Sequence, residues 1–478
     1  MNFKMILNVL GWILLFEAGF LLLPAAVSLA FAEWQTAVGF LISAGICLVP
    51  GAILAARRPA VTQLFAKEGF VVVSLSWITL SLFGCLPFLF SGATQSFTDA
   101  LFETVSGFTT TGATIFADVE VLPRGILFWR SFTHWVGGMG VLVFLLAFLP
   151  LSGGRNMHIM RAESPGPDVS KLVPRVRTTA AILYSIYLAM TVLQFVLLLF
   201  GGMDVFESLC TAFSTAGTGG FGLKNDGLAG ATPYVQIVVT VFMLLFSVNF
   251  NSYYLLLARR PREAFTTEVK VFFAMVASGI LIITLSNFES FELLGDTVRH
   301  AAFSVASVVS TTGFATADFG VWPLLSQTTL LLLMFVGACA GSTGGGFKLS
   351  RVLILFKNAA REVRRQISPR EVRQITLDRR PISDEIARGV STYLVVYVLI
   401  YFASLLLLSI SGGDFTTNAT SVLATLNNVG PGLSKVGPMG NYSIFSLPSK
   451  LVLIFDMLAG RLELFPILVL FSPKTWRR

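Results

Sequence analysis

The sequence has few charged residues for its length, and this shortage is the first guide to its class. Only 13% of the 478 residues are charged, whereas 54% are hydrophobic and the mean hydropathy is +0.77. Soluble globular domains carry about 25% charged residues, so the composition excludes an ordinary soluble chain. Most of the protein is expected to lie in lipid.

Cysteine and histidine are also scarce. Those present are Cys47, Cys85, Cys210, Cys339, His134, His158 and His300. The cysteines lie in apolar or glycine-rich runs without paired spacing, so no disulfide framework is predicted. The histidines are scattered and have no carboxylate or cysteine partners at ligand spacing, so metal-centred chemistry is not predicted either.

Long apolar runs divide the chain into an opening pair and four similar units. About 20 apolar residues cross the hydrocarbon core, which makes 8–31 and 36–56 two spans of an N-terminal domain, 1–68. The first run is interpreted as a retained span and not as a signal peptide. The units that follow are 69–150, 177–258, 266–357 and 388–473.

Each unit contains a long apolar segment, a shorter semi-polar segment and a second long apolar segment. The short segments, such as 99–108 and 204–216, hold about 10 to 13 residues, too few to span a membrane. They are interpreted as helices that enter the membrane and turn back. The chain is therefore predicted to be an all-α membrane protein with ten full spans and four pore helices.

A glycine flanked by small or hydroxylic residues follows each short segment. The four motifs are Phe108-Thr109-Thr110-Thr111-Gly112-Ala113, Ala216-Gly217-Thr218-Gly219-Gly220-Phe221, Ser310-Thr311-Thr312-Gly313-Phe314 and Asn427-Asn428-Val429-Gly430-Pro431. The glycines lie on the order of 100 residues apart, as four walls of one pseudo-fourfold pore require. Six positions before each glycine the residues are small: Ser106, Ser214, Ser307 and Ala424. Two spans per unit would orient the units alike, as parallel repeats around one axis.

The motifs predict a cation-coordinating filter. A desolvated monovalent cation needs a ring of oxygen atoms, and backbone that passes a glycine can turn several carbonyl groups inward. Threonine hydroxyls can add ligands, and the negative ends of the pore-helix dipoles favour a cation. The predicted ion-binding residues are Thr110, Thr111, Gly112, Thr218, Gly219, Gly220, Thr311, Thr312, Gly313, Asn428, Val429 and Gly430. A helix C-cap is the alternative for any one glycine, but four copies in register favour the filter.

Lysine and arginine predict the orientation of the chain. The stretches 57–67, 155–177, 259–270 and 348–388 are basic, whereas the loops with the glycine motifs carry few cations. By the positive-inside rule these stretches and both termini are cytoplasmic, and the pore loops open outside. The net charge of +8 then needs no nucleic-acid partner. The mixed charges of 351–388 indicate either a connector near anionic lipid headgroups or a docking surface for a cytoplasmic partner.

The glycine motifs resemble those of the Trk, Ktr and plant high-affinity potassium transporter superfamily, most of all its TrkH-like membrane subunits. The resemblance covers the whole chain, and the opening pair is similar to the extra N-terminal domain of these subunits. It implies potassium as the permeant ion and one filter glycine per repeat: Gly112, Gly220, Gly313 and Gly430. Some plant relatives that favour sodium have serine at the first of these positions. The fourth motif departs from the threonine-rich pattern, so a less sharply selective filter is expected.

The resemblance also implies partners and a location. It predicts a homodimer in the bacterial cytoplasmic (inner) membrane, in contact with lipid and bound to a TrkA-like ring of nucleotide-binding regulatory subunits. No organic cofactor is expected in this chain.

A glycine-rich interruption in the second apolar segment of the third unit predicts a gate. Five of the ten residues 337–346 are glycine, and each glycine costs a helix about 1 kcal/mol relative to alanine. Non-helical backbone at membrane depth is tolerated only where protein or a water-filled path satisfies it. The predicted gating loop, which the resemblance also implies, is Ala338, Cys339, Ala340, Gly341, Ser342, Thr343, Gly344, Gly345 and Gly346. Close helix packing through small residues is the alternative.

Arg461 lies inside the last apolar segment. An ionisable residue at membrane depth is costly and indicates a function. Its match to an arginine of TrkH-like subunits implies that it faces the permeation path below the filter and opposes a resident cation. The alternative is an intramembrane salt bridge with Glu463 or Asp456.

Three classes of function are considered: a channel, an ion-coupled symporter, and an enzyme or scaffold. The filter favours a channel-like potassium-uptake subunit gated by a cytoplasmic partner. The alternatives are a symporter coupled to protons or sodium, for which intramembrane carboxylates are few, and a less selective cation channel. An enzyme or a scaffold is disfavoured, because the sequence has no nucleotide fingerprint, nucleophile elbow or paired-carboxylate site.

Overall fold

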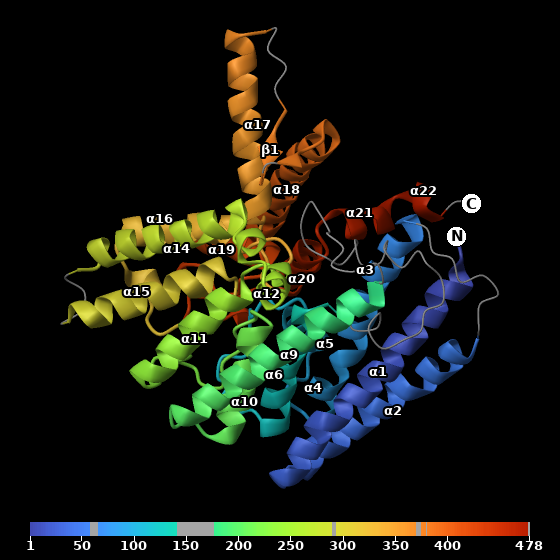
Figure 1. The fold of residues 1–478 in the computed structure, drawn as a ribbon. Coiled ribbons are helices and arrows are strands. Elements are labelled where there is room, and N and C mark those ends of the chain that lie inside the picture. Colours follow the sequence, from blue (N-terminus) through green and yellow to red (C-terminus); the bar gives the residue numbers. More distant parts are fainter. Residues whose placement is uncertain (58–65, 141–175, 289–292, 370–373, 379, 477–478) are drawn as a thin grey trace.

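The computed structural model describes residues 1–57, 66–140, 176–288, 293–369, 374–378 and 380–476. Within them the chain is almost wholly helical, as predicted (Figure 1). Strands are confined, in this part of the chain, to an antiparallel ribbon of β1 (Thr376–Leu377) and β2 (Arg380–Pro381). The last ten residues of the first predicted unit, 141–150, and most of the basic stretch 155–177 lie outside the described residues.

Six helices among the described residues are long and apolar enough to cross a membrane. They are α1 (Phe3–Ala30), α2 (Trp34–Ala56), α3 (Ala66–Gly84) continued by α4 (Leu86–Phe90), α9 (Val176–Phe200), α14 (Thr267–Ser286) and α18 (Asp384–Ile410). Large apolar side chains on these helices are exposed, as at Leu188, Leu281 and Leu399. Such surfaces suit contact with lipid tails.

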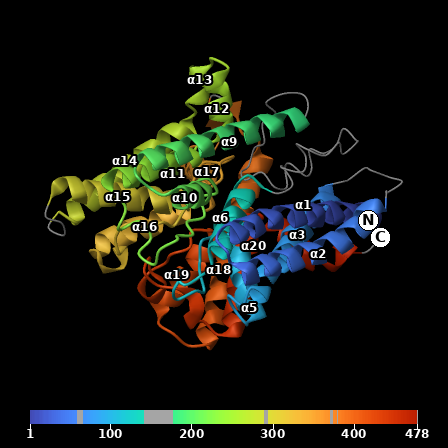
Figure 2. The same cartoon turned by 90° about the horizontal axis from the view of Figure 1, so that it is seen from below.

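The opening pair forms as predicted, and α1 and α2 lie side by side (Figure 2). A Cβ on Gly11 would lie 2.7 Å from the Leu54 side chain, and one on Gly51 would lie 3.1 Å from that of Leu14. Glycine on each helix therefore permits this close approach. The pair packs against the first unit through α3 and α6 (Arg124–Gly138).

Each unit also contains the predicted short helix. These helices are α5 (Phe97–Phe108), α10 (Val205–Ala216), α15 (Leu294–Val309) and α19 (Phe415–Leu426). Three begin at a polar N-cap, where Ser96, Asp204 and Asp414 accept backbone N–H groups. Such caps satisfy donors that the first turn leaves unpaired. In every one of the four, the C-cap residue lies three positions before a motif glycine; these C-caps are Thr109, Gly217, Ser310 and Asn427.

The second apolar segments are not continuous helices, whereas the sequence predicted an interruption only in the third unit. In the second unit α11 (Pro233–Phe246) and α12 (Phe250–Leu257) meet at a bend of 91°. In the third, the glycine-rich stretch separates α16 (Leu324–Val336) from α17 (Leu349–Ile367). In the fourth, three residues separate α20 (Leu447–Arg461) from α21 (Phe465–Phe471). In the first, α6 ends at Gly138, two residues before the described part stops.

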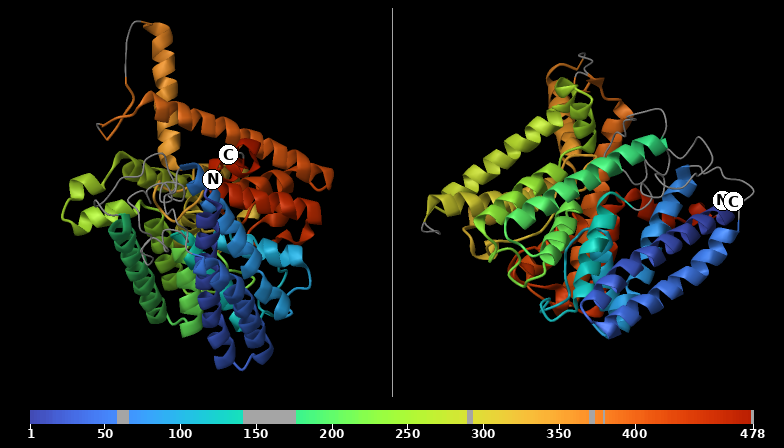
Figure 3. Two further views of the ribbon diagram at one scale, coloured as in Figure 1. Left: turned by 90° about the vertical axis from the view of Figure 1, so that its right-hand side faces the viewer. Right: turned by 60° about the horizontal axis from the view of Figure 1, so that its bottom comes forward.

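Helix α17 stands away from the rest of the molecule, beside the β ribbon (Figures 1 and 3). The two ends of the chain lie close together, with the rings of Phe3 and Trp476 stacked at 6.5 Å. Trp476 belongs to α22 (Pro473–Trp476). The remaining elements are short connections: α13 (Pro261–Ala264) and 3-10 turns at Phe319–Val321, Ser434–Val436 and Tyr442–Ile444.

Candidate functional site

The four glycine motifs adopt one backbone conformation. Each motif glycine has a positive φ, of +78°, +77°, +85° and +93° at Gly112, Gly220, Gly313 and Gly430. Two positions earlier φ is also positive, between 54° and 60°, at Thr110, Thr218, Thr311 and Asn428. A left-handed residue other than glycine costs roughly 1–2 kcal/mol. Its recurrence in four loops indicates a conformation that the surrounding structure imposes.

Hydrogen bonds repeat in the same register. In every loop the residue before the glycine donates its N–H over 2.9 Å to the carbonyl five positions back. The acceptors are Ser106, Ser214, Ser307 and Ala424, the small residues that lie six positions before each motif glycine. The hydroxyls of Ser214 and Ser307 also donate to the carbonyls of Phe221 and Phe314, at 3.1 and 2.6 Å.

The four loops contact one another in cyclic order. A Cβ on any motif glycine would overlap the carbonyl oxygen of the residue that precedes the glycine of the next loop. These contacts run from Gly112 to Gly219, from Gly220 to Thr312, from Gly313 to Val429 and from Gly430 back to Thr111. The loops therefore close a ring, and all the pore helices end at it. The negative ends of four helix dipoles meet there.

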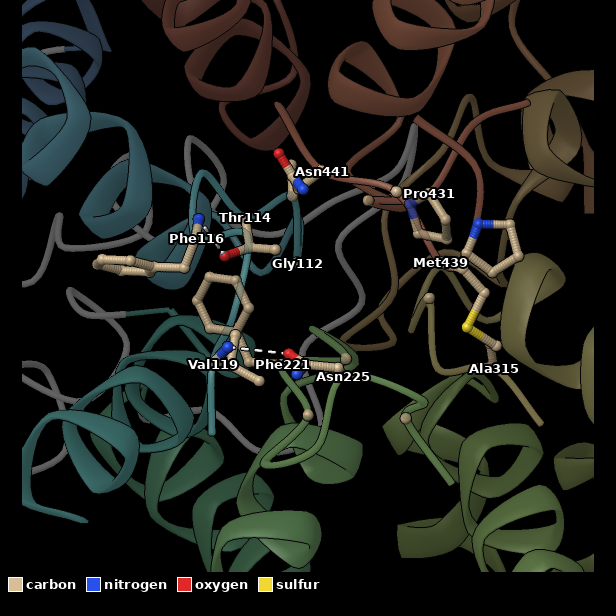
Figure 4. Close-up of a pocket in the computed structure, with 18 of the residues that line it drawn as sticks. Gly112, Thr114, Phe116, Val119, Phe221, Asn225, Ala315, Pro431, Met439 and Asn441 are labelled. Atoms are coloured by element: carbon tan, nitrogen blue, oxygen red, sulfur yellow. Dashed lines mark hydrogen bonds between the residues drawn. The ribbon is translucent and has the colours of Figure 1, made fainter. Parts of the chain in front are cut away.

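A pocket of about 120 Å³ opens on the ring, and all four units line it. Figure 4 shows Gly112, Phe221, Ala315 and Pro431, one residue from each unit, around this pocket. Adjacent rim loops are joined by backbone hydrogen bonds. Leu228 donates to the Ala315 carbonyl at 2.9 Å, and Tyr442 donates to the Thr114 carbonyl at 2.8 Å.

Asn225 joins the first two rim loops. Its side-chain oxygen accepts the Val119 N–H at 2.9 Å (Figure 4), and its amide group donates to Asp118 at 2.8 Å. Asp118 is fully exposed, and the hydrogen bond from Asn225 lowers the pKa of its carboxyl group. The rim is therefore held by polar contacts that keep Asp118 ionised.

A buried ion pair behind the ring was missed by the sequence analysis. Arg130 Nε lies 2.8 Å from Glu103 Oε1, and the two side chains are 2% and 0% exposed. Thr114 and Ile115 also donate to Glu103, and the Arg130 guanidinium lies 4.1 Å from the centre of the Phe221 ring. The pair thus ties α5 and α6 to the first two loops. The available signal was one acidic and one basic residue in the middle of two neighbouring helical segments of one unit.

The predicted gating loop lies directly against the ring. Gly345 donates its N–H to the Thr311 hydroxyl at 2.6 Å, and Gly346 donates to the Asn427 carbonyl at 2.9 Å. These partners precede the motif glycines in sequence, whereas the pocket is lined by the glycines and residues after them. The loop and the pocket therefore contact opposite sides of the ring.

Groups from the second and third units satisfy the backbone of this loop. At the break between α11 and α12, Ser247 accepts the Cys339 N–H at 3.1 Å and Phe250 donates to the Gly341 carbonyl at 3.0 Å. The carboxylate of Glu268 on α14 accepts the N–H groups of Ala340 and Ser350 at 2.8 and 3.0 Å. Protein groups thus supply the partners that non-helical backbone needs at membrane depth.

Arg461 connects the loop to the first unit. Its guanidinium donates to the Thr343 carbonyl at 2.9 Å, and to the carbonyls of Gly138 and Gly137, at the end of α6, at 2.8 and 2.5 Å. The carboxylates named as alternative partners have other contacts. Glu463 pairs with Arg351 on α17, and Asp456 accepts from Ser404 at 2.7 Å.

The comparisons with known proteins agree with this geometry. Residues 38–478 match the sequence model of a family described as "TrkH: Cation transport protein". Over the full length of both chains the protein is 36% identical to the Trk system potassium uptake protein TrkH of Escherichia coli strain K12. It is 31% identical to TrkG of that strain, over 99% of each chain.

A solved structure shows the same fold. The crystal structure of the potassium transporter TrkH from Vibrio parahaemolyticus matches all of both chains, with a TM-score of 0.89 and 32% identity. The similarity inferred from the glycine motifs and the all-α membrane fold are thereby confirmed. The relatives are transport proteins, and with the six apolar helices they identify the chain as an integral membrane protein.

Substitution of Glu103 by Ala should strongly destabilise the protein, because it leaves the buried Arg130 charge without its carboxylate. Breaking a buried pair in this way costs about 3–5 kcal/mol. Glu207→Ala is the control, because it removes one partner of the exposed pair between Lys224 and Glu207, 3.5 Å apart, which is worth at most about 1 kcal/mol. Thermal unfolding of the purified protein in detergent measures both. Equal, small losses would contradict a bracing role for Glu103.

Proposed function

Because the chain belongs to the TrkH family of cation transport proteins, we propose that it carries potassium into the cell through the ring of four loops. The cyclic contact between motif glycines and neighbouring carbonyls supports this most directly. A potassium ion exchanges its hydration shell for a ring of carbonyl oxygens. The relatives from Escherichia coli are named as potassium uptake proteins.

In this proposal potassium is the transported substrate and the ring is its selectivity filter. The ion enters from the pocket and is coordinated by oxygens of residues 110–112, 218–220, 311–313 and 428–430. The converging pore-helix dipoles lower its energy there. The protein lies in the bacterial inner membrane with both termini in the cytoplasm, which the positive-inside rule supports.

The fourth loop fits this filter despite its different sequence. The Asn428 amide group donates to the Thr111 hydroxyl at 3.0 Å and to the Met457 carbonyl at 2.9 Å. It therefore joins the fourth loop both to the first loop and to α20. This contact supports a potassium filter in which the fourth wall is as firmly held as the others.

The loop 338–346 and Arg461 form the proposed gate. The loop lies on the side of the ring opposite the pocket, and its hydrogen bonds reach the second, third and fourth units. Arg461 adds a positive charge and a link to the end of α6. A cation that leaves the filter toward the cytoplasm meets both elements.

Helix α17 is the proposed docking site for a cytoplasmic regulatory partner of the TrkA type. It begins at Leu349, three residues after the gating loop ends, and it carries the exposed side chains of Arg364 and Arg365. Phe356 and Val363 on the same helix are 71% and 62% exposed. A partner that moves α17 pulls on the gate directly. The protein acts as a homodimer in this proposal.

Proton-coupled symport is the second candidate, and one observation favours it. The Glu17 side chain on α1 is fully buried, and neither of its carboxylate oxygens has a hydrogen-bond partner within the described residues. A buried carboxyl group of this kind is able to hold a proton. A shift of the reversal potential with a proton gradient, in liposomes that contain the purified protein, would favour symport.

Gly112→Ser should lower the selectivity for potassium over sodium. A Cβ at this position overlaps the Gly219 carbonyl, and a loss of about 1.4 kcal/mol of differential binding lowers the permeability ratio about tenfold. Reversal potentials under potassium and sodium gradients measure the ratio. Gly202→Ser is the control, because Gly202 has a similar φ of +82° but no atom within 4 Å of a Cβ. An unchanged permeability ratio in a folded Gly112→Ser variant would show that the ring is not the selectivity filter.

Arg461→Ala should raise potassium flux in the absence of any partner. A unit charge about 5 Å from the ion opposes it by about 3 kcal/mol at an effective dielectric constant of about 20. Arg461→Lys keeps the charge and should keep the flux low. Potassium influx into liposomes measures both. If the Ala variant and a variant that lacks residues 342–345 both fold and show no rise, neither element is the closed gate.

Reversal of the charges at Arg364, Arg365 and Arg380 to Glu should weaken co-purification of a TrkA-like regulatory subunit. The flux of the isolated protein should not change, because these side chains are exposed and far in sequence from the ring. The control reverses Arg259, Arg260 and Arg262, an equal change of charge elsewhere. Normal complex formation by the variant with these three reversals would favour contact with lipid headgroups instead.

A further inference from the structure

His134 on α6 is buried behind the second loop of the ring, and the proposed mechanism does not use it. Its side chain is 0% exposed, and neither ring nitrogen has a hydrogen-bond partner within the described part of the chain. A buried polar group without a partner is costly. A favourable contribution of this imidazole elsewhere in the structure must therefore offset the cost of burying it.

The second loop lacks side chains that the first and third loops use to hold themselves. In those two loops the residue that caps the pore helix and the residue before the glycine pair through their hydroxyls. Thr109 and Thr111 are 2.8 Å apart, and Ser310 and Thr312 are 2.6 Å apart. The second loop has Gly217 and Gly219 at these positions.

His134 occupies the space that those side chains would fill. A Cβ on Gly219 would overlap the imidazole ring, and one on Gly217 would overlap the His134 carbonyl group. The imidazole also stacks on Phe221, with the ring centres 4.3 Å apart and the planes inclined by 22°. Phe221 directly follows the motif glycine Gly220. His134 thus contacts the loop on both sides of its ion-binding residues.

The surroundings favour a neutral imidazole that acts by its shape. The Arg130 guanidinium lies 4.1 Å from the centre of the same Phe221 ring. A second positive charge beside it would be repelled in this buried place. The unpartnered nitrogens agree, since an imidazolium would have two donors to satisfy.

We propose that His134 is a positioning residue that determines the selectivity of the second filter wall. Its imidazole stands in for the missing loop side chains and holds Thr218, Gly219 and Gly220 in the conformation that the other loops share. The inference rests on the proposed function of the ring as a potassium filter. Its residue-level content, that α6 supplies the missing side chain, goes beyond that function.

Reciprocal substitutions test this inference in liposomes that contain the full-length protein. His134→Ala empties the space and Gly219→Thr overfills it, so each alone should lower the potassium-to-sodium permeability ratio by about tenfold. The double variant places a threonine where the first and third loops have Thr111 and Thr312, and it should restore most of the ratio. A purely structural loss would reduce the amount of active protein without changing the ratio.

Two further variants keep the test decisive. His134→Phe retains a planar ring without nitrogen atoms, so its permeability ratio should stay close to that of the wild type. This variant provides the test if His134→Ala does not fold. His300→Ala is the matched control, because His300 is only half-buried and pairs with the Thr316 hydroxyl at 2.9 Å instead of with a motif glycine. A double variant no better than the worse single one would overturn the inference.

The outcomes separate this inference from the proposed function. If Gly112→Ser changes the ratio while His134→Ala and Gly219→Thr do not, the ring is the filter and His134 does not position it. If Gly112→Ser also has no effect, the proposed filter itself is wrong.

Discussion

The contact between each motif glycine and a carbonyl group of the next loop is the constraint on which the rest of the structure depends. Any Cβ at these positions would displace backbone of the neighbouring loop, so the ring closes only with glycine in the left-handed region. Closure in turn requires that four pore helices end at one place and carry small residues six positions before the glycine. The short helices, their caps and their hydrogen-bond register all follow from that requirement.

A second constraint comes from the membrane, where each backbone donor and acceptor needs a partner. The glycine-rich loop cannot be helical, so its polar groups are satisfied by the α11–α12 break, by Glu268, by the ring and by Arg461. Those same bonds connect the loop to every unit, since Arg461 also reaches the end of α6. The element proposed as the gate is thus stabilised in part by Arg461 at the end of α20 and by Glu268, which also accepts the N–H of Ser350 on α17.

The sequence predicted the local features of the site better than the long-range ones. The pore helices and glycine register depend on nearby residues, and α5 and α10 end where the motifs indicated. The bend between α11 and α12 was missed, because Ser247, Val248 and Asn249 carry neither glycine nor proline to mark it. The pairs Glu103–Arg130 and Arg351–Glu463 were also missed. Their partners come together only when separate helices pack, which no local pattern reports.

The four loops reach one backbone conformation by different side-chain contacts. The first and third use hydroxyl pairs, the second is packed by the imidazole of His134 from another helix, and the fourth is held by the Asn428 amide. Their φ values at the motif glycine nevertheless fall between 77° and 93°. An ion bound by carbonyl oxygens is coordinated by backbone atoms. Loops of different sequence can therefore offer it equivalent ligands when their backbone conformation is the same. In the proposed filter, the departure of the fourth motif from the threonine pattern therefore does not in itself require lower selectivity.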